Sequence, residues 1–186
     1  KPQYQSMDVL KFTDYEKLVQ TVIELKDNKD IILLELINHL AARISNLNKI
    51  NYLIAVYTND KGSMSDQKEI QEIIKLRHSI PDKLFLSGYK IEEDIKIKHE
   101  NMVELLYFLD KNEIPVYGHI GLGGLHPVLR SRSKIKELFE EVIKLGGDIS
   151  NEYGIGSLKK NLIPQTIQQE LLKIKQKFDP FNIINT

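Results

Sequence analysis

The chain contains 186 residues, 41% of them hydrophobic, and its 26 basic and 26 acidic side chains give a formal charge of zero. This length suits one domain with a sizeable core, or two small lobes packed closely together. The balanced charge gives no argument for nucleic acid or an anionic membrane as a partner. No apolar run reaches the roughly 18 to 20 residues that a membrane-spanning helix needs.

The chain has no cysteine and begins with Lys1 rather than methionine. Without cysteine there are no disulfides and no thiolate metal ligands, and the composition is compatible with a reducing cytosol. No signal peptide is visible. We therefore expect a cytoplasmic protein, and the first residue suggests a piece of a longer chain.

Hydrophobic periodicity predicts strands and helices that alternate along the chain. Short runs rich in apolar, β-branched and aromatic residues predict strands at 9–12, 31–37, 51–58, 84–86, 91–97, 116–121 and 125–129. Apolar residues at helical spacing predict helices at 13–28, 39–47, 65–77, 99–111, 133–145 and 164–178.

Local signals mark some of the boundaries. Thr13 and Glu16 have the spacing of a capping box at a helix start. Pro81 is expected to break the chain before the strand at 84–86. Gly146 and Gly147 suit a left-handed helix end. Several strand pairs are joined too briefly for a parallel crossover, so we predict an α+β fold: an antiparallel sheet with helices packed mainly on one face.

Two histidines and one glutamate form the candidate functional site. His119 and His126 lie seven residues apart in a glycine-rich segment, and Glu152 follows one helix later in a second turn. Imidazole nitrogens and a carboxylate oxygen are ligands that suit zinc, iron or manganese, and three protein ligands leave a position open for water or substrate. The alternative interpretation is two ordinary hydrogen-bonded histidines and a solvated glutamate.

Four segments resemble the C-terminal domain of the FAD-linked oxidases, a family that includes glycolate oxidase, D-lactate dehydrogenase and D-2-hydroxyglutarate dehydrogenase. The segments are GHIGLGGLHP, GGDISNEYGIGSLKK, FDPFNIIN and the upstream IIKLRHSIPDKLFLSGYKIEEDI. In the same order, they are similar to the family patterns G-H-x-G-D-G-N-L-H, S-G-E-H-G-x-G and D-P-x-x-I-x-N-P, and to a Leu-x-x-Arg segment that is followed by an acidic strand. The resemblance covers essentially the whole chain.

The resemblance implies that residues 1–186 are one ferredoxin-like cap domain, and that FAD is held mainly by an N-terminal domain missing from this chain. The implied reaction oxidises a small 2-hydroxy acid with hydride transfer to that FAD, so the fragment alone should be inactive. The implied metal ligands are His119, His126 and Glu152. The cofactor-binding residues are unknown, and the implied partners are the substrate and a flavin-binding domain or subunit.

Three further residues receive roles from the resemblance. Arg77 and Lys90 match the positions that help bind the substrate carboxylate, although each is equally well explained as an ordinary helix-end or loop charge. Tyr153 stands where relatives place the histidine that accepts the substrate proton. Because a free phenol has a pKa of about 10, either Tyr153 or a metal-bound hydroxide would have to serve as the base.

Leu122 replaces the usual acid and Gly124 the usual asparagine, so the polar bonding of the turn differs from the family pattern. Tyr153 in place of the histidine base keeps two alternative functions open. The chain would then be a non-catalytic docking subunit of a split flavoenzyme, or part of a related flavoenzyme whose substrate is not a hydroxy acid.

Overall fold

The computed structural model describes residues 5–183, apart from the side chains of residues 157 and 158. The chain divides into two compact units, Lys1–Glu152 and Tyr153–Thr186, so its assignment as one domain over residues 1–186 stays a prediction. Residues 184 and 185 of the FDPFNIIN segment lie outside the described part.

A single antiparallel sheet forms the frame of the first unit. Its strands are β1 (Ser6–Phe12), β2 (Ile31–Ile37), β3 (Asn51–Tyr57), β4 (Ile91–Glu92), β5 (Ile95–Lys96), β6 (Val116–Gly118) and β7 (Gly124–Leu129). The order is β1-β3-β2-β6-β7-β4, with β5 paired to β7, and every pairing is antiparallel. The predicted α+β class with an antiparallel sheet is confirmed.

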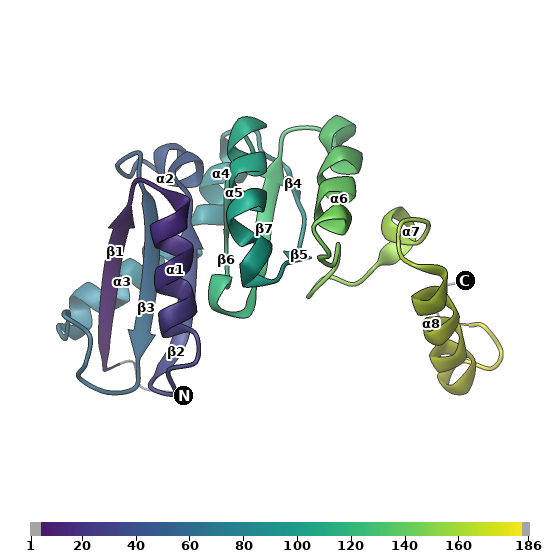
Figure 1. The fold of residues 1–186 in the computed structure, drawn as a ribbon, viewed down its shortest axis with the longest axis horizontal. Helices are drawn as coiled ribbons and strands as arrows, with labels where there is room; N and C mark the ends of the chain where they lie inside the picture. Colours follow the sequence, from purple (N-terminus) through teal and green to yellow (C-terminus); the bar gives the residue numbers. More distant parts are fainter. Residues whose placement is uncertain (1–4, 184–186) are drawn as a thin grey trace. The chain divides into compact units, whose positions relative to one another are not determined.

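The helices of the first unit cover both faces of this sheet, whereas the prediction placed them mainly on one face. They are α1 (Tyr15–Leu25), α2 (His39–Ile44), α3 (Gln67–His78), α4 (Ile80–Leu86), α5 (Met102–Lys111) and α6 (Ile135–Lys144), with short 3₁₀ turns η1 (His99–Asn101), η2 (Ile120–Leu122) and η3 (Arg132–Lys134). Figure 1 shows α1 and α5 side by side in front of the sheet and α3 behind it. The helix α1 joins β1 to β2 while β3 lies between these strands, which is a split βαβ arrangement.

The interior strand β3, between β1 and β2, carries much of the core. All seven of its residues are buried, because helices cover the sheet from both sides. Its alternate residues Tyr52, Ile54 and Val56 pack with α2, α3 and α4. Leu53 and Ala55 are fully buried on the opposite face. Burying one leucine or isoleucine side chain contributes about 1.5–3 kcal/mol, so both faces stabilise the sheet that holds the candidate site.

Several local predictions are wrong, and the strand predicted at 116–121 already ends at Gly118. Residues 84–86 form the end of helix α4 and not a strand, and Pro81 lies in the first turn of that helix. Proline is tolerated there because the first amides of a helix have no partner within the helix. The cap of α1 is Asp14, whose side chain accepts a hydrogen bond from the Lys17 amide at 2.8 Å, instead of the predicted Thr13.

The predicted strand at 91–97 is interrupted. It forms the two short strands β4 and β5, both paired to β7. The interruption falls at Glu93 and Asp94, both of which are buried. The break places the Asp94 carboxylate where it accepts hydrogen bonds from the backbone amides of Asn151 and Glu152.

The second unit contains α7 (Gly156–Lys159) and α8 (Gln165–Phe178). Helix α8 ends as the sequence predicts. The Asp179 carboxylate pairs with Lys175 at 2.6 Å and accepts a hydrogen bond from the Ile183 amide at 2.7 Å.

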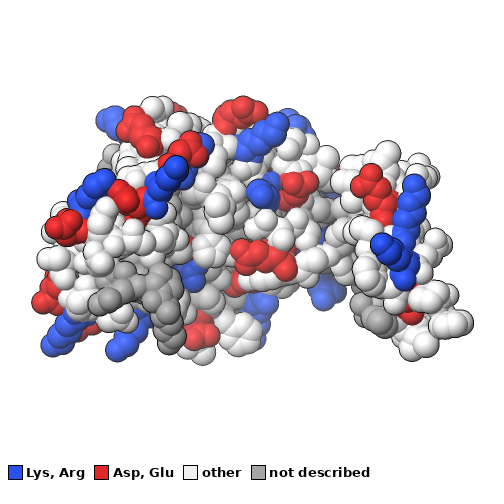
Figure 2. Space-filling view, turned by 90° about the horizontal axis from the view of Figure 1, so that it is seen from below, with Lys and Arg blue, Asp and Glu red and all other residues white. Residues whose placement is uncertain are grey.

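Surface charge agrees with the neutral composition. On the face drawn in Figure 2, acidic and basic side chains are interspersed. Among residues 5–183, no helix combines the length and the apolar character needed to cross a membrane.

Candidate metal centre

The loop between β6 and β7 places the two histidines. After β6, Gly118 has a φ of +140° and Gly123 a φ of +77°, conformations that side chains with a Cβ rarely adopt. The His119 carbonyl accepts hydrogen bonds from the amides of Leu122 at 2.9 Å and Gly124 at 3.2 Å. The chain therefore folds back tightly, and β7 returns His126 to a position opposite Tyr117 of β6.

Glu152 reaches the same region because its turn is held by a buried acid. Asp94 is fully buried, and one of its oxygens accepts hydrogen bonds from the backbone amides of Asn151, at 2.7 Å, and Glu152. Backbone pairing between Lys96 and Asp148, at 2.8 Å in both directions, ties the preceding residues to β5. Asp94 thus fixes the backbone that carries Glu152.

A glycine makes room for this turn. A Cβ at Gly124 would lie 2.9 Å from the side-chain amide nitrogen of Asn151. The Asn151 side chain therefore lies directly against β7 at the start of the strand. The close approach of the turn to β7 brings Glu152 towards the two rings.

The three predicted ligands meet in space. The Nε2 atom of His119 lies 3.9 Å from Oε1 of Glu152, and Nε2 of His126 lies 3.9 Å from Oε2 of the same carboxylate. One ligand atom from each residue lies within 4.8 Å of the others. A tetrahedral ion about 2.1 Å from each ligand keeps the ligand atoms about 3.4 Å apart. The donor atoms and their spacing are therefore those of a divalent-ion site whose ligand atoms have to draw closer together, and the Glu152 side chain, 44% exposed, has room to move.

A buried ion pair lies behind His119. The Nδ1 atom of His119 contacts Oε1 of Glu35. Arg77 contacts the other carboxylate oxygen through Nε at 2.8 Å and Nη2 at 2.7 Å. Glu35 has no exposed surface. Sequence reasoning missed Glu35, although a single acid inside the apolar run at 31–37 was the available signal.

These contacts change the protonation of the site. The hydrogen bond with Glu35 raises the pKa of His119 above its ordinary value of 6.5. Burial lowers the pKa of His126, so this ring is neutral at neutral pH. Burial also favours the protonated form of Glu35, but His119 and Arg77 outweigh it and hold the pKa of Glu35 below 4.5. The site thus presents one neutral imidazole and an ionised buried carboxylate.

The other predicted residues are placed differently. The Arg77 side chain is mostly buried and binds Glu35. The Lys90 ammonium lies 5.5 Å from the centre of the Phe85 ring. Tyr153 is the first residue of the second unit and is 55% exposed. The structure therefore brings three of the six predicted residues together and adds Glu35 and Asp94 behind them.

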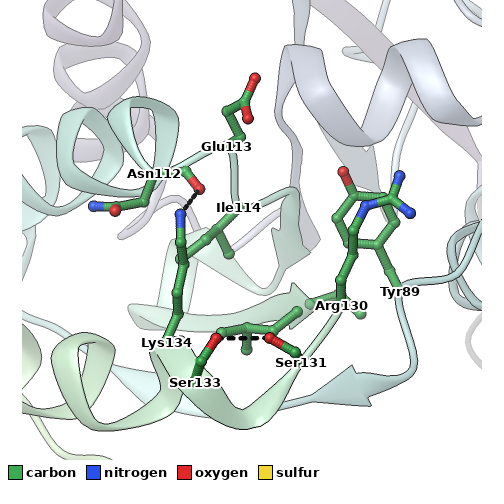
Figure 3. A pocket seen from close by; sticks show the side chains of 10 residues that line it. Tyr89, Asn112, Glu113, Ile114, Arg130, Ser131, Ser133 and Lys134 are labelled. Carbon is green, nitrogen blue, oxygen red and sulfur yellow. Dashed lines mark hydrogen bonds between the residues drawn. The ribbon is translucent and has the colours of Figure 1, made fainter.

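A separate hollow of about 250 Å³ lies near the start of α6. Figure 3 shows Arg130 stacked over Tyr89, with its guanidinium carbon 4.1 Å from the ring centre, and Lys134 donating to the Asn112 carbonyl at 2.8 Å. Its described lining includes none of the six residues predicted for the site. The cations at its rim are already engaged by neighbouring protein groups.

Comparison with known sequences identifies relatives. The family described as FAD linked oxidases, C-terminal domain, matches residues 54–186. The chain is 33% identical over 87 residues to glycolate oxidase subunit GlcD of Bacillus subtilis (strain 168), which covers 39% of this chain and 18% of that protein. It is 27% identical over 143 residues to mitochondrial D-2-hydroxyglutarate dehydrogenase of Rattus norvegicus, covering 67% and 27%. It is 40% identical over 86 residues to D-lactate dehydrogenase of Archaeoglobus fulgidus, covering 39% and 19%.

The matched regions span between 18% and 27% of the length of these three relatives. Most of each relative therefore has no counterpart in these 186 residues.

Proposed function

The chain belongs to the family of FAD-linked oxidase C-terminal domains, and we propose that it is the substrate-binding cap of a flavin-dependent 2-hydroxy-acid dehydrogenase or oxidase of the glycolate or D-lactate type. The family gives the general class, an FAD-dependent oxidoreductase. The substrate, the metal and the role as a cap are our proposal. FAD would be held by a flavin-binding domain or subunit outside these residues, so we expect the 186-residue chain alone to be inactive.

The convergence of His119, His126 and Glu152 carries this proposal. Two imidazoles and one carboxylate whose ligand atoms lie within 4.8 Å of each other offer the donor set of a catalytic zinc, iron or manganese site. When bound, such an ion polarises a hydroxyl or carboxylate oxygen as a Lewis acid.

The candidate ligands of this chain would hold the ion, and the substrate would be oriented against it. His126 is nearly buried and neutral, whereas Glu152 is partly exposed and able to adjust its distance. A flavin accepts hydride in this class of reaction. The roles of Tyr153 as proton acceptor and of Arg77 and Lys90 in binding the substrate carboxylate stay predictions.

One observation favours a second candidate. Arg77 already pairs with Glu35, and Lys90 lies against Phe85, so neither cation is seen among the three candidate ligands. A substrate without a carboxylate would need neither of them. The alternative functions are therefore a related flavoenzyme with a non-hydroxy-acid substrate, or a docking subunit without catalysis.

The test uses the full-length protein together with its flavin-binding part. Elemental analysis measures bound zinc, iron and manganese, and a dye acceptor follows turnover of glycolate, D-lactate and D-2-hydroxyglutarate and of a phenol that lacks a carboxylate. We expect one metal per chain and turnover of at least one acid, both lost in His126→Ala and kept in the control His39→Gln. Turnover only of substrates without a carboxylate would favour the second flavoenzyme, and no turnover of any substrate would favour the docking subunit.

The cytoplasmic location also stays a prediction. Fractionation of cells that express the full-length protein would test it, and recovery in the membrane or secreted fraction would contradict it.

A further inference from the structure

Glu35 contacts both Arg77 and His119, and burying its carboxylate costs free energy that hydrophobic packing does not recover. Glu35 is fully buried within β2, between the buried residues Leu34 and Leu36. Moving a carboxylate out of water costs several kcal/mol unless charges and hydrogen bonds compensate for it, and a buried pair is weak evidence for stability. Its placement therefore suggests a functional purpose.

The topology decides which groups Glu35 meets. Glu35 is paired directly with Ile54 of β3, and directly paired residues point to the same face of a sheet. Ile54 belongs to the core packed against α2, α3 and α4. The Glu35 carboxylate therefore faces the side of the sheet on which α3 delivers Arg77 from its last turn.

The two carboxylate oxygens of Glu35 contact different residues. Arg77 contacts Oε2 twice, through Nε at 2.8 Å and through Nη2 at 2.7 Å. The remaining oxygen, Oε1, contacts Nδ1 of His119. Because both guanidinium contacts go to Oε2, Arg77 holds that oxygen and leaves Oε1 for His119.

This contact selects one tautomer of His119. An ionised carboxylate only accepts hydrogen bonds, so the proton of the neutral ring must lie on Nδ1. The lone pair is then on Nε2, the atom that lies 3.9 Å from Glu152. A carboxylate behind a histidine ligand orients the ring and increases its basicity towards a metal.

We propose that Glu35 is a positioning residue of the metal centre, that it holds His119 with Nε2 directed at the ion, and that Arg77 supports this contact by pairing with Glu35. The inference has two arms. The first is weaker zinc binding when Glu35 is replaced, and it rests on the proposed metal site. The second is the tautomer of His119, which needs no metal.

Zinc binding to the full-length protein, measured by competition with a chelating dye, tests the first arm. The variants are Glu35→Gln, which keeps the shape and removes the charge, and the double variant Glu35→Leu/Arg77→Met. The double change replaces the buried pair with apolar groups, which proteins often tolerate without loss of stability. We expect both variants to bind zinc about 10- to 100-fold more weakly.

The matched control is Asp110→Asn. Asp110 pairs with His39 at 2.5 Å, a second histidine–carboxylate contact that involves no candidate ligand. This variant should bind zinc with the wild-type affinity. Circular dichroism and thermal melting would check that every variant folds.

Nitrogen NMR of ¹⁵N-histidine in the zinc-free protein tests the second arm, at alkaline pH where the rings are neutral. We expect His119 to carry its proton on Nδ1 in the wild type and in Asp110→Asn, and to lose this preference in the double variant. A proton on Nε2 in the wild type, or wild-type zinc affinity in both Glu35 variants, would overturn the proposal. If the wild type binds no zinc, the metal site fails by itself, and the tautomer result alone decides the role of Glu35.

Discussion

The substitution Gly123→Ala should damage the loop that separates the two histidines. Gly123 has a φ of +77°, and a Cβ at this position would lie 2.3 Å from the carbonyl oxygen of Ile97. Because that oxygen belongs to the backbone, a side-chain rotation cannot relieve the clash. Either the loop or the 95–97 segment must move by about 1 Å to reach an ordinary contact distance.

The expected loss is about 3 kcal/mol of unfolding free energy. A left-handed conformation costs an alanine about 1–2 kcal/mol. The required shift would also disturb the hydrogen bond from the Ile97 amide to the Gly123 carbonyl, 2.9 Å long, which contributes about 1 kcal/mol. Zinc affinity should fall as well, since the loop connects His119 to His126.

Gly146→Ala is the matched control. Gly146 also has a positive φ, +69°, but no atom lies within 4 Å of the position of its Cβ. It should therefore lose only the conformational part, about 1–2 kcal/mol, and keep its zinc affinity. Urea unfolding of the chain, followed by circular dichroism, measures both variants. Equal losses for the two substitutions would refute the steric reasoning.

Three more substitutions test the fold and the site. Asp94→Asn should weaken zinc binding about tenfold in the chelator assay, because it removes the charge that holds the Glu152 amide; unchanged affinity would show that the turn holds itself. Leu53→Ala should cost about 3 kcal/mol in urea unfolding, since Leu53 is fully buried in β3; a loss under 1 kcal/mol would contradict the assigned core. Burial favours a higher pKa for Asp8, but hydrogen bonds from Ser63 and Tyr57 outweigh it and hold the pKa below 3.8. The stabilisation by Asp8 is therefore complete above pH 3.8 and is lost as the pH falls through the lower folded value. Asp8→Asn should flatten this acid limb of stability against pH, and an unaltered limb would rule out Asp8 as its source.

Local sequence patterns were sufficient for most elements. The apolar runs at 31–37 and 51–57 form the strands β2 and β3, because a buried strand needs apolar side chains on both faces. The left-handed glycine at 146 ends α6 as predicted. The run at 84–86 was too short to separate a strand from a helix, and the packing of Leu84 in the core of α2, α3 and α4 decided for the helix.

The sequence identified His119, His126 and Glu152 as candidate ligands, because they lie in glycine-bounded segments that resemble the motifs of one family. It could not supply the residues behind them. Glu35 lies 42 positions from Arg77, and Asp94 lies 58 positions from Glu152. No local pattern links such residues, since their contacts arise only when strand pairing and helix packing bring distant segments to one face of the sheet. The candidate ligands could therefore be predicted from the sequence. The buried groups that hold them in place and set their charge are determined by the tertiary structure.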